Sequence, residues 1–172
     1  MGRMADETAA PGKDAFEQLM SLLDYPMYVV TARADDELAG CLVGFTSQVS
    51  IRPPRFLVGL SKRNHTYRVA LHTDHLAVHL LPRRHRELAR LFGSKTGDRV
   101  NKFERCAWQA GPHGLSVLTD AVGWFVGSVL SRIDVGDHVG FLLEPITGSA
   151  PRKFEQLVTF ADVRDLDPGH EA

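Results

Sequence analysis

Several features that define particular classes of protein are scarce or missing in this sequence of 172 residues. Its two cysteines, Cys41 and Cys106, show no CxxC pairing, which favours buried, reduced thiols over a disulfide framework. The net charge of −1 provides no basic footprint for nucleic acid. No apolar run approaches the roughly 18 residues that a membrane-spanning helix needs, and residues 1–14 lack the hydrophobic segment of a signal peptide. We therefore expect a cytoplasmic protein that binds neither nucleic acid nor membranes.

The composition that remains is typical of an ordinary globular domain. Hydrophobic residues make up 44% of the chain and charged residues 24%. A chain of this length can bury a core of its own, and no repeat or linker divides it. We expect one domain over residues 14–166, with a disordered N-terminal tail at residues 1–13 and a polar C-terminal tail at residues 167–172.

Short apolar segments separated by turn residues recur along the chain, and helical spacing is rare. The pattern predicts strands at residues 27–33, 38–43, 56–60, 75–81, 106–108, 121–133, 138–147 and 157–163. It predicts helices at residues 14–24, 67–71 and 82–93. Many short strands at hairpin spacing favour a mainly β fold with a closed antiparallel barrel.

The most informative stretch runs from residue 40 to residue 68. A small, hydroxylated segment, residues 43–50, precedes two prolines, and a cationic turn, residues 61–66, follows the apolar strand at residues 56–60. Proline has no N–H to donate and ends a strand ladder. Two polar turns beside adjacent strands would suit a neutral ring system with an anionic tail. Local sequence alone favours a simple hydroxyl-rich turn between strands at residues 43–50. At residues 61–66 a solvated basic turn is as consistent with the sequence as a phosphate site.

This stretch resembles the flavin reductase-like family, and further landmarks follow in the family's order over roughly residues 25–145. The matching segments are Val49-Ser50-Ile51-Arg52-Pro53-Pro54, Ser61 to Thr66, Leu76 to Leu81, Phe92-Gly93-Ser94-Lys95, Lys102-Phe103 and Gly136-Asp137-His138. The resemblance implies an FMN-binding split β-barrel with a few peripheral helices. It also implies a homodimer with flavin at the subunit interface.

The same resemblance implies an NAD(P)H:flavin oxidoreductase. NADH or NADPH would reduce FMN or FAD, and the reduced flavin would pass electrons to oxygen or to a partner monooxygenase. A non-catalytic FMN-binding electron carrier, or a protein that only holds the cofactor, is the alternative. Flavin that is reduced by neither nucleotide would indicate the carrier.

The family's motifs also imply the site residues. The expected flavin-binding residues are Val43, Gly44, Phe45, Thr46, Ser47, Ser50, Ser61, Lys62, Asn64, His65, Thr66, His79, Phe92, Gly93 and Lys95. The expected catalytic residue is His138, beside the nicotinamide, where it would orient the reactants. The structural alternative for His138 is a histidine in a hairpin turn. The structural alternative for Phe92-Gly93-Ser94-Lys95 is a helix C-cap followed by a basic loop. Phe45 stands where many relatives carry a hydroxyl residue, and residues 158–166 lack the family's aromatic-arginine-glycine segment.

Three histidines at HxxHxxxH spacing, His72, His75 and His79, raise the question of a metal site. In the predicted turn and strand only His75 and His79 would share a face. No cysteine or carboxylate stands at ligand spacing, so we predict no metal.

Overall fold

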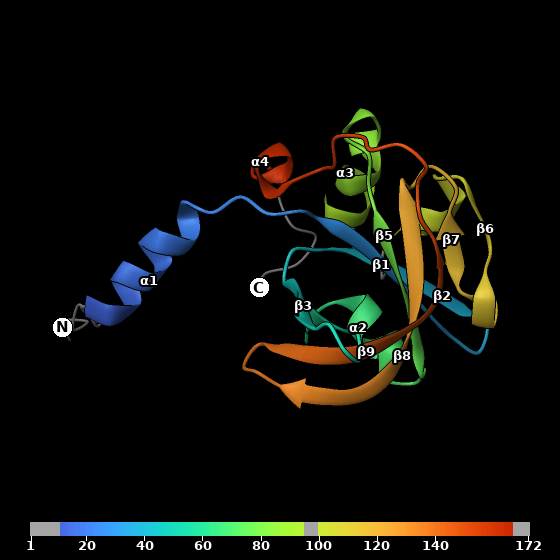
Figure 1. Cartoon of the computed structure of the whole chain (residues 1–172), viewed down its shortest axis with the longest axis horizontal. Helices are drawn as coiled ribbons and strands as arrows, with labels where there is room; N and C mark the ends of the chain where they lie inside the picture. The colour runs from blue at the N-terminus through green and yellow to red at the C-terminus, as the bar shows by residue number, and fades with distance from the viewer. Residues whose placement is uncertain (1–10, 95–99, 167–172) are drawn as a thin grey trace, which may run out of the picture.

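The computed structural model describes residues 11–94 and 100–166, and a curled antiparallel sheet forms its body (Figure 1). The sheet comprises seven strands in the order β2-β1-β5-β8-β9-β4-β3. These are β1 (Tyr28–Ala34), β2 (Glu37–Val43), β3 (Thr46–Ser50), β4 (Arg55–Ser61), β5 (His75–Leu80), β8 (Gly123–Asp134) and β9 (His138–Ser149). Within the described ranges no ladder joins the edge strands β2 and β3. The closed barrel that the strand pattern favoured is therefore wrong, because β2 and β3 remain edge strands. The fold is a split β-barrel, as the family resemblance implied.

Strand β1 shows why the barrel needs helices on its outer side. Val30 packs inside the barrel with Val58, Val78 and Phe141. Its neighbour Val29 faces the other way and is also fully buried. Successive side chains of a strand point to opposite faces, so a strand buried on both faces must be covered from outside as well as from inside. The predicted hairpin of β1 and β2 is confirmed.

The outer cover consists of short helices and a small second sheet. They are α3 (Arg86–Ser94), which follows the 3₁₀ turn η1 (Arg83–His85), η2 (Lys102–Glu104), η3 (Pro112–Gly114), β6 (Trp108–Ala110), β7 (Ser116–Leu118) and α4 (Phe160–Val163). The helix predicted at residues 67–71 exists as α2 (His65–Ala70), which lies against β1 and β2. Both cysteines are free, as predicted, although Cys106 is only half-buried.

Three predicted segments differ in the structure. The strand predicted at residues 106–108 lies instead at Trp108–Ala110, as β6. The hydroxylated segment at residues 43–50 is mostly strand β3, so only Gly44 and Phe45 form a connection. The strand predicted at residues 157–163 is wrong. Leu157 and Thr159 make only isolated bridges, and α4 follows. A capping box between Thr159 and Asp162 starts this helix, and its two hydrogen bonds outweigh the weak apolar alternation that suggested a strand.

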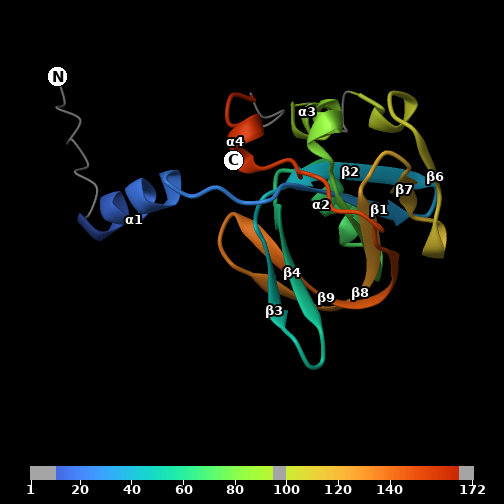
Figure 2. The same ribbon diagram turned by 45° about the horizontal axis from the view of Figure 1, so that its top comes forward.

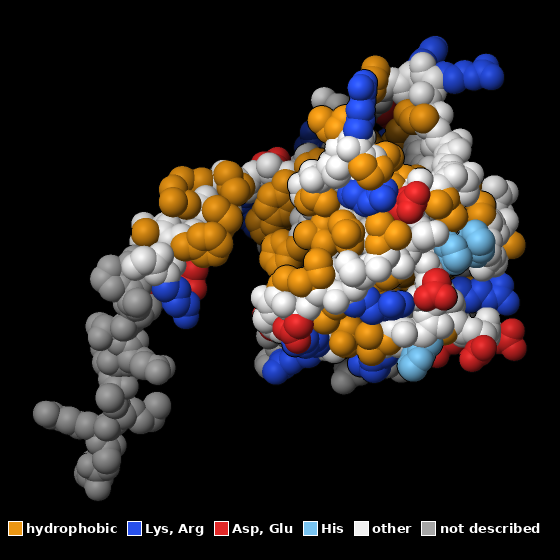
Figure 3. All heavy atoms as spheres, turned by 60° about the horizontal axis from the view of Figure 1, so that its bottom comes forward, with side chains coloured by type: hydrophobic (Ala, Val, Ile, Leu, Met, Phe, Trp, Pro, Cys, Tyr) orange, Lys and Arg blue, Asp and Glu red, His pale blue; other side chains and the backbone are white. Residues whose placement is uncertain are grey.

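The first helix, α1 (Pro11–Ser21), stands away from the barrel (Figures 1 and 2). It begins three residues before the predicted start at Asp14, so residues 11–13 belong to the helix rather than to a tail. It ends at Ser21, earlier than predicted. Hydrophobic side chains on α1 remain uncovered, and more of them lie on the adjoining face of the body (Figure 3). No helix among the described residues is long and apolar enough to cross a membrane.

Candidate functional site

The structure brings four of the expected site residues to one edge of the barrel, here called the His138 edge: Phe45, Ser61, Lys62 and His138. Ser61, at the end of β4, lies opposite His138, at the start of β9. The ring of Phe45 lies against the imidazole of His138, with 5.0 Å between their centroids. A hydrogen bond of 2.7 Å from the Gly59 N–H to the Phe45 carbonyl holds the connection in place. Residues far apart in the sequence therefore form one continuous surface.

A neighbouring carboxylate holds the imidazole of His138. The Nδ1 atom of His138 lies 2.7 Å from Oδ1 of Asp137. This hydrogen bond lowers the pKa of the Asp137 carboxyl. Because a carboxylate only accepts hydrogen bonds, Nδ1 carries the proton and Nε2 is left as the ring's remaining polar atom. The turn that presents this pair depends on Gly136, whose φ of 131° few other residues adopt.

Lys62 already has a partner at this edge. Its Nζ lies 2.7 Å from Oδ2 of Asp134, and this contact lowers the pKa of the Asp134 carboxyl. Its backbone N–H also donates to the carbonyl of Asp137. Lys62 thus ties the turn after β4 to the hairpin between β8 and β9. An anionic ligand at Lys62 would have to share its ammonium with Asp134.

The other residues of the cationic turn mainly order the turn itself. The side chain of Asn64 caps α2 by accepting a hydrogen bond of 2.8 Å from the Thr66 N–H. Thr66 is buried, so its hydroxyl does not face solvent. The Ser61 hydroxyl accepts a weak hydrogen bond of 3.3 Å from the Arg63 N–H. These hydrogen bonds order the turn without a ligand.

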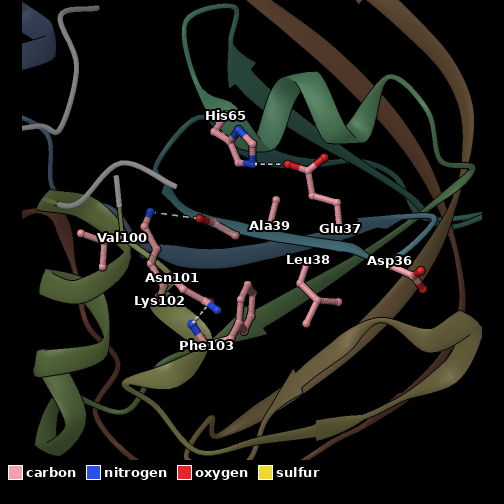
Figure 4. Close-up of a pocket in the computed structure, with 10 residues that line it drawn as sticks. Asp36, Glu37, Leu38, Ala39, His65, Val100, Asn101, Lys102 and Phe103 are labelled. Carbon is pink, nitrogen blue, oxygen red and sulfur yellow. Dashed lines mark hydrogen bonds and ion pairs between the residues drawn. The ribbon is translucent and has the colours of Figure 1, made fainter. Parts of the chain in front are cut away.

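His65, from the same turn, lines a polar pocket of about 460 Å³ beside the edge strand β2 (Figure 4). Its Nε2 lies 2.8 Å from Oε1 of Glu37. Across the pocket, the Lys102 ammonium donates to the carbonyls of Gly40 and Phe92 at 3.1 and 3.0 Å. Lys102 is only 5% exposed, and burial lowers its pKa. Among residues 11–94 and 100–166 no carboxylate pairs with this ammonium, but Asp36 and Glu37 also line the pocket, so its lining carries charges of both signs.

Gly44, Thr46 and Ser47 contribute to a second cavity, an apolar groove of about 490 Å³. Aromatic side chains dominate its lining, which includes Tyr25, Tyr28, Phe56 and Phe125. Thr46, at the start of β3, lines the groove together with Tyr28. A Cβ at Gly44 would lie 2.8 Å from the Tyr25 ring, so the chain can pass this wall only as glycine. The segment from Gly44 to Ser47 therefore separates the apolar groove from the His138 edge.

Several expected contacts lie away from these surfaces. His79 is fully buried, and its Nδ1 lies 2.9 Å from the Val29 carbonyl while its Nε2 accepts from the Leu118 N–H at 3.2 Å. Val43 and Phe92 are core residues. Ser50 lies at the end of β3, and Gly93 packs against Leu42. The last expected residue, Lys95, lies outside the described residues.

Sequence reasoning missed the roles of three charged residues near the candidate site. Asp134 pairs with Lys62, Asp137 bonds His138, and Lys102 has a buried ammonium. The two aspartates flank a glycine in the turn before His138, and that spacing was an available signal. The three histidines form no metal cluster with other ligands in the part of the chain that the structure describes. His75 instead stacks on His113, with ring centroids 3.6 Å apart.

Comparison with known proteins identifies the family. A family model described as "Flavin reductase like domain" matches residues 20–164. A "Probable flavin reductase" of Rhizobium meliloti (strain 1021) is 30% identical over 114 residues, which is 64% of this chain but only 36% of that protein. "FMN reductase (NADH) RutF 2" of Rhizobium rhizogenes is 32% identical over 126 residues, 73% of this chain and 72% of that protein.

The fold agrees with this assignment. The crystal structure of a flavin reductase domain protein from Arthrobacter sp. FB24 superposes with a TM-score of 0.78 at 21% identity, covering 87% of this chain and 91% of that chain. The chain spans half or less of the length of two of the curated relatives that it matches. The family model nevertheless matches most of the chain, residues 20–164, so the chain belongs to the flavin reductase-like domain family.

Proposed function

We propose that this protein is an NAD(P)H-dependent flavin reductase that binds its flavin at the His138 edge. The observation that carries the proposal is the convergence of Phe45, Ser61, Lys62 and His138 on one surface. Phe45 is 61% exposed, and its ring is free to meet a flat aromatic ligand. Family membership supports flavin as that ligand.

The residues present fit an anionic flavin. The ring system would lie beside Phe45 and His138, and the phosphate-bearing tail would extend along the turn at residues 61–66. Lys62 supplies positive charge there, which it would share between the phosphate and Asp134. A relative named "FMN reductase (NADH)" favours FMN as the flavin and NADH as the donor.

When bound, the flavin accepts a hydride from the reduced nicotinamide, which is the chemistry of the two cofactors. The protein's task is to orient the two rings and to exclude water. Asp137 fixes the imidazole of His138, so that Nε2 is presented in a constant orientation. Oxygen or a partner monooxygenase would be the acceptor of the electrons. The free thiols suit a reducing, cytoplasmic location, and we propose a homodimer.

The test is the visible absorption spectrum of the purified protein with FMN or FAD, before and after anaerobic NADH or NADPH. A bound flavin band that bleaches rapidly is the expected result. Persistence of the band with both nucleotides would favour the carrier alternative, and failure of both flavins to bind would refute the proposal.

Variants locate the chemistry. His138→Ala should slow the bleaching while leaving flavin binding measurable. His85→Ala is a matched control, because this histidine pairs with Glu87 on the surface of a different part of the fold. Equal rates in the two variants would remove His138 from the proposed site.

A further inference from the structure

Strand β8 is longer than its neighbour β5, and its last residues form an overhang, residues 129–134. The ladder between β5 and β8 ends at the pair His75 and Ser128. The ladder between β8 and β9 continues as far as Asp134. On the side where β5 has ended, two charged side chains of the overhang bind the chain that lies beside it.

The first of them is Arg132, which binds the end of the segment that contains α2. This segment, residues 62–74, is here called the α2 segment. The Arg132 guanidinium donates hydrogen bonds to the carbonyls of Thr73, at 2.6 Å, and Ala70, at 3.4 Å. The carbonyls at the end of a helix lack partners within the helix, and a cation suits them. Arg132 therefore holds the α2 segment at its C-terminal end.

The second side chain, Asp134, holds the other end of the α2 segment. Its carboxylate lies 2.7 Å from the Lys62 ammonium. Arg132 and Asp134 are two residues apart and follow the last register shift of β8, so they lie on one face of the strand. Together they bind both ends of the α2 segment, and we call this pair the α2 clamp.

The Arg132 side chain is itself held in place. Its guanidinium lies over the ring of Phe141, 5.6 Å from the ring centroid, and Phe141 is the residue opposite Arg132 in the ladder with β9. The Asp74 carboxylate lies 4.0 Å away. Because Phe141 is fully buried, the guanidinium rests on a fixed part of the barrel core.

The α2 clamp joins the two parts of the candidate site. The α2 segment begins with the cationic turn, and the hairpin of β8 and β9 carries His138. Val69 and Ala70 of α2 are buried in the barrel core, so the helix does not need Arg132 in order to fold. Loss of Arg132 should shift the segment rather than unfold it.

We propose that Arg132 is a positioning residue of the candidate site, which fixes the cationic turn relative to His138. The inference rests on the proposed function, in which the flavin phosphate lies along that turn and the flavin ring beside His138. A ligand that spans both parts depends on their separation. A misplacement of about 1 Å can lower the rate of a reaction roughly a hundredfold.

Hydrogen exchange of the flavin-free protein tests the α2 clamp itself. Arg132→Met keeps an unbranched stem over Phe141 and removes the donors. The N–H groups of Lys62 and Asn64, bonded to the carbonyls of Asp137 and Ser61, lie at the opposite end of the α2 segment. Their exchange should become at least about fivefold faster. Faster exchange confined to residues 70–74 would overturn the proposal.

Arg33→Met is the matched control for this experiment. Arg33 also donates to a backbone carbonyl, that of Gly114 at 3.1 Å, and its side chain is 36% exposed, against 32% for Arg132. It lies between β1 and η3, so exchange at Lys62 should not change. An equal effect of the two variants would also overturn the proposal.

Flavin titration and single-turnover reduction test the consequence for the site. Arg132→Met should raise the FMN dissociation constant about tenfold and slow reduction by saturating NADH about tenfold. Riboflavin, which has no phosphate, should bind within about twofold of the wild-type value. Arg132→Lys retains a charged donor and should recover part of both losses.

The outcomes separate this inference from the proposed function. Wild-type values in Arg132→Met, or equal weakening of FMN and riboflavin, would overturn the positioning role. If the wild-type protein binds no flavin, the proposed function fails, and hydrogen exchange alone then decides whether Arg132 holds the cationic turn in place.

Discussion

Protonation of His79 should make this protein markedly less stable in mild acid. Its ring is fully buried, and both nitrogens are engaged by backbone groups. The Val29 carbonyl requires a proton on Nδ1, and the Leu118 N–H requires a lone pair on Nε2. A second proton on the ring would sit on Nε2, which would then be a donor facing the Leu118 N–H, itself a donor. Burial accordingly lowers the pKa of His79 from 6.5 to about 4.

The sign and size of the effect follow from proton linkage. Between pH 6.5 and 4 the unfolded chain binds a proton at His79 that the folded chain does not, so stability is lost as the pH falls. A difference of about 2.5 pKa units corresponds to roughly 3 kcal/mol in total, and about 2.5 kcal/mol of this should be lost between pH 7.5 and 4.5. The contribution is fully present above pH 6.5 and absent below pH 4.

Urea denaturation followed by tryptophan fluorescence at several pH values measures this loss. His79→Asn retains an amide that can both donate and accept, so it should fold while losing this part of the pH dependence. Other groups titrate in acid too, but they contribute equally to both proteins. His85→Asn serves as the control at a surface histidine. An unchanged pH slope in His79→Asn, or an NMR titration of the folded His79 ring near pH 6, would refute the reasoning.

Four further predictions concern the His138 edge and the turn that follows β4. Lys62→Ala should weaken FMN binding, measured by fluorescence titration, by about 1–3 kcal/mol, whereas Asp134→Asn should strengthen FMN but not riboflavin binding, because it releases the ammonium. Asp137→Asn should lower the rate of flavin reduction and change its pH profile while flavin affinity stays constant, since it removes the acceptor that orients His138. Asn64→Ala should lower the unfolding free energy by about 1 kcal/mol through loss of the α2 cap, and an unchanged urea midpoint would contradict that.

The barrel strands were predictable because their signals are local. Apolar runs bounded by turn residues marked β8 and β9, and the hairpin of β1 and β2 followed from alternation around two aspartates. The end of the chain was not predictable in the same way. At residues 157–163 an alternating pattern suggested a strand, whereas the capping box of Thr159 favours a helix. In the structure Leu157 and Thr159 make single bridges to Pro82 and Pro26, and helix α4 follows. Such bridges join residues far apart in the sequence.

The sequence indicated which residues could belong to the candidate site, but not which contacts each of them makes. The family motifs pointed to Lys62 and His138, and the structure places both on one edge. They did not reveal that Asp134 already pairs with Lys62, because that contact spans two hairpins. His79 occupies a motif position that suggested a flavin contact, yet its neighbours from β1 and β7 enclose it. Burial depends on packing from distant elements, which spacing alone does not encode.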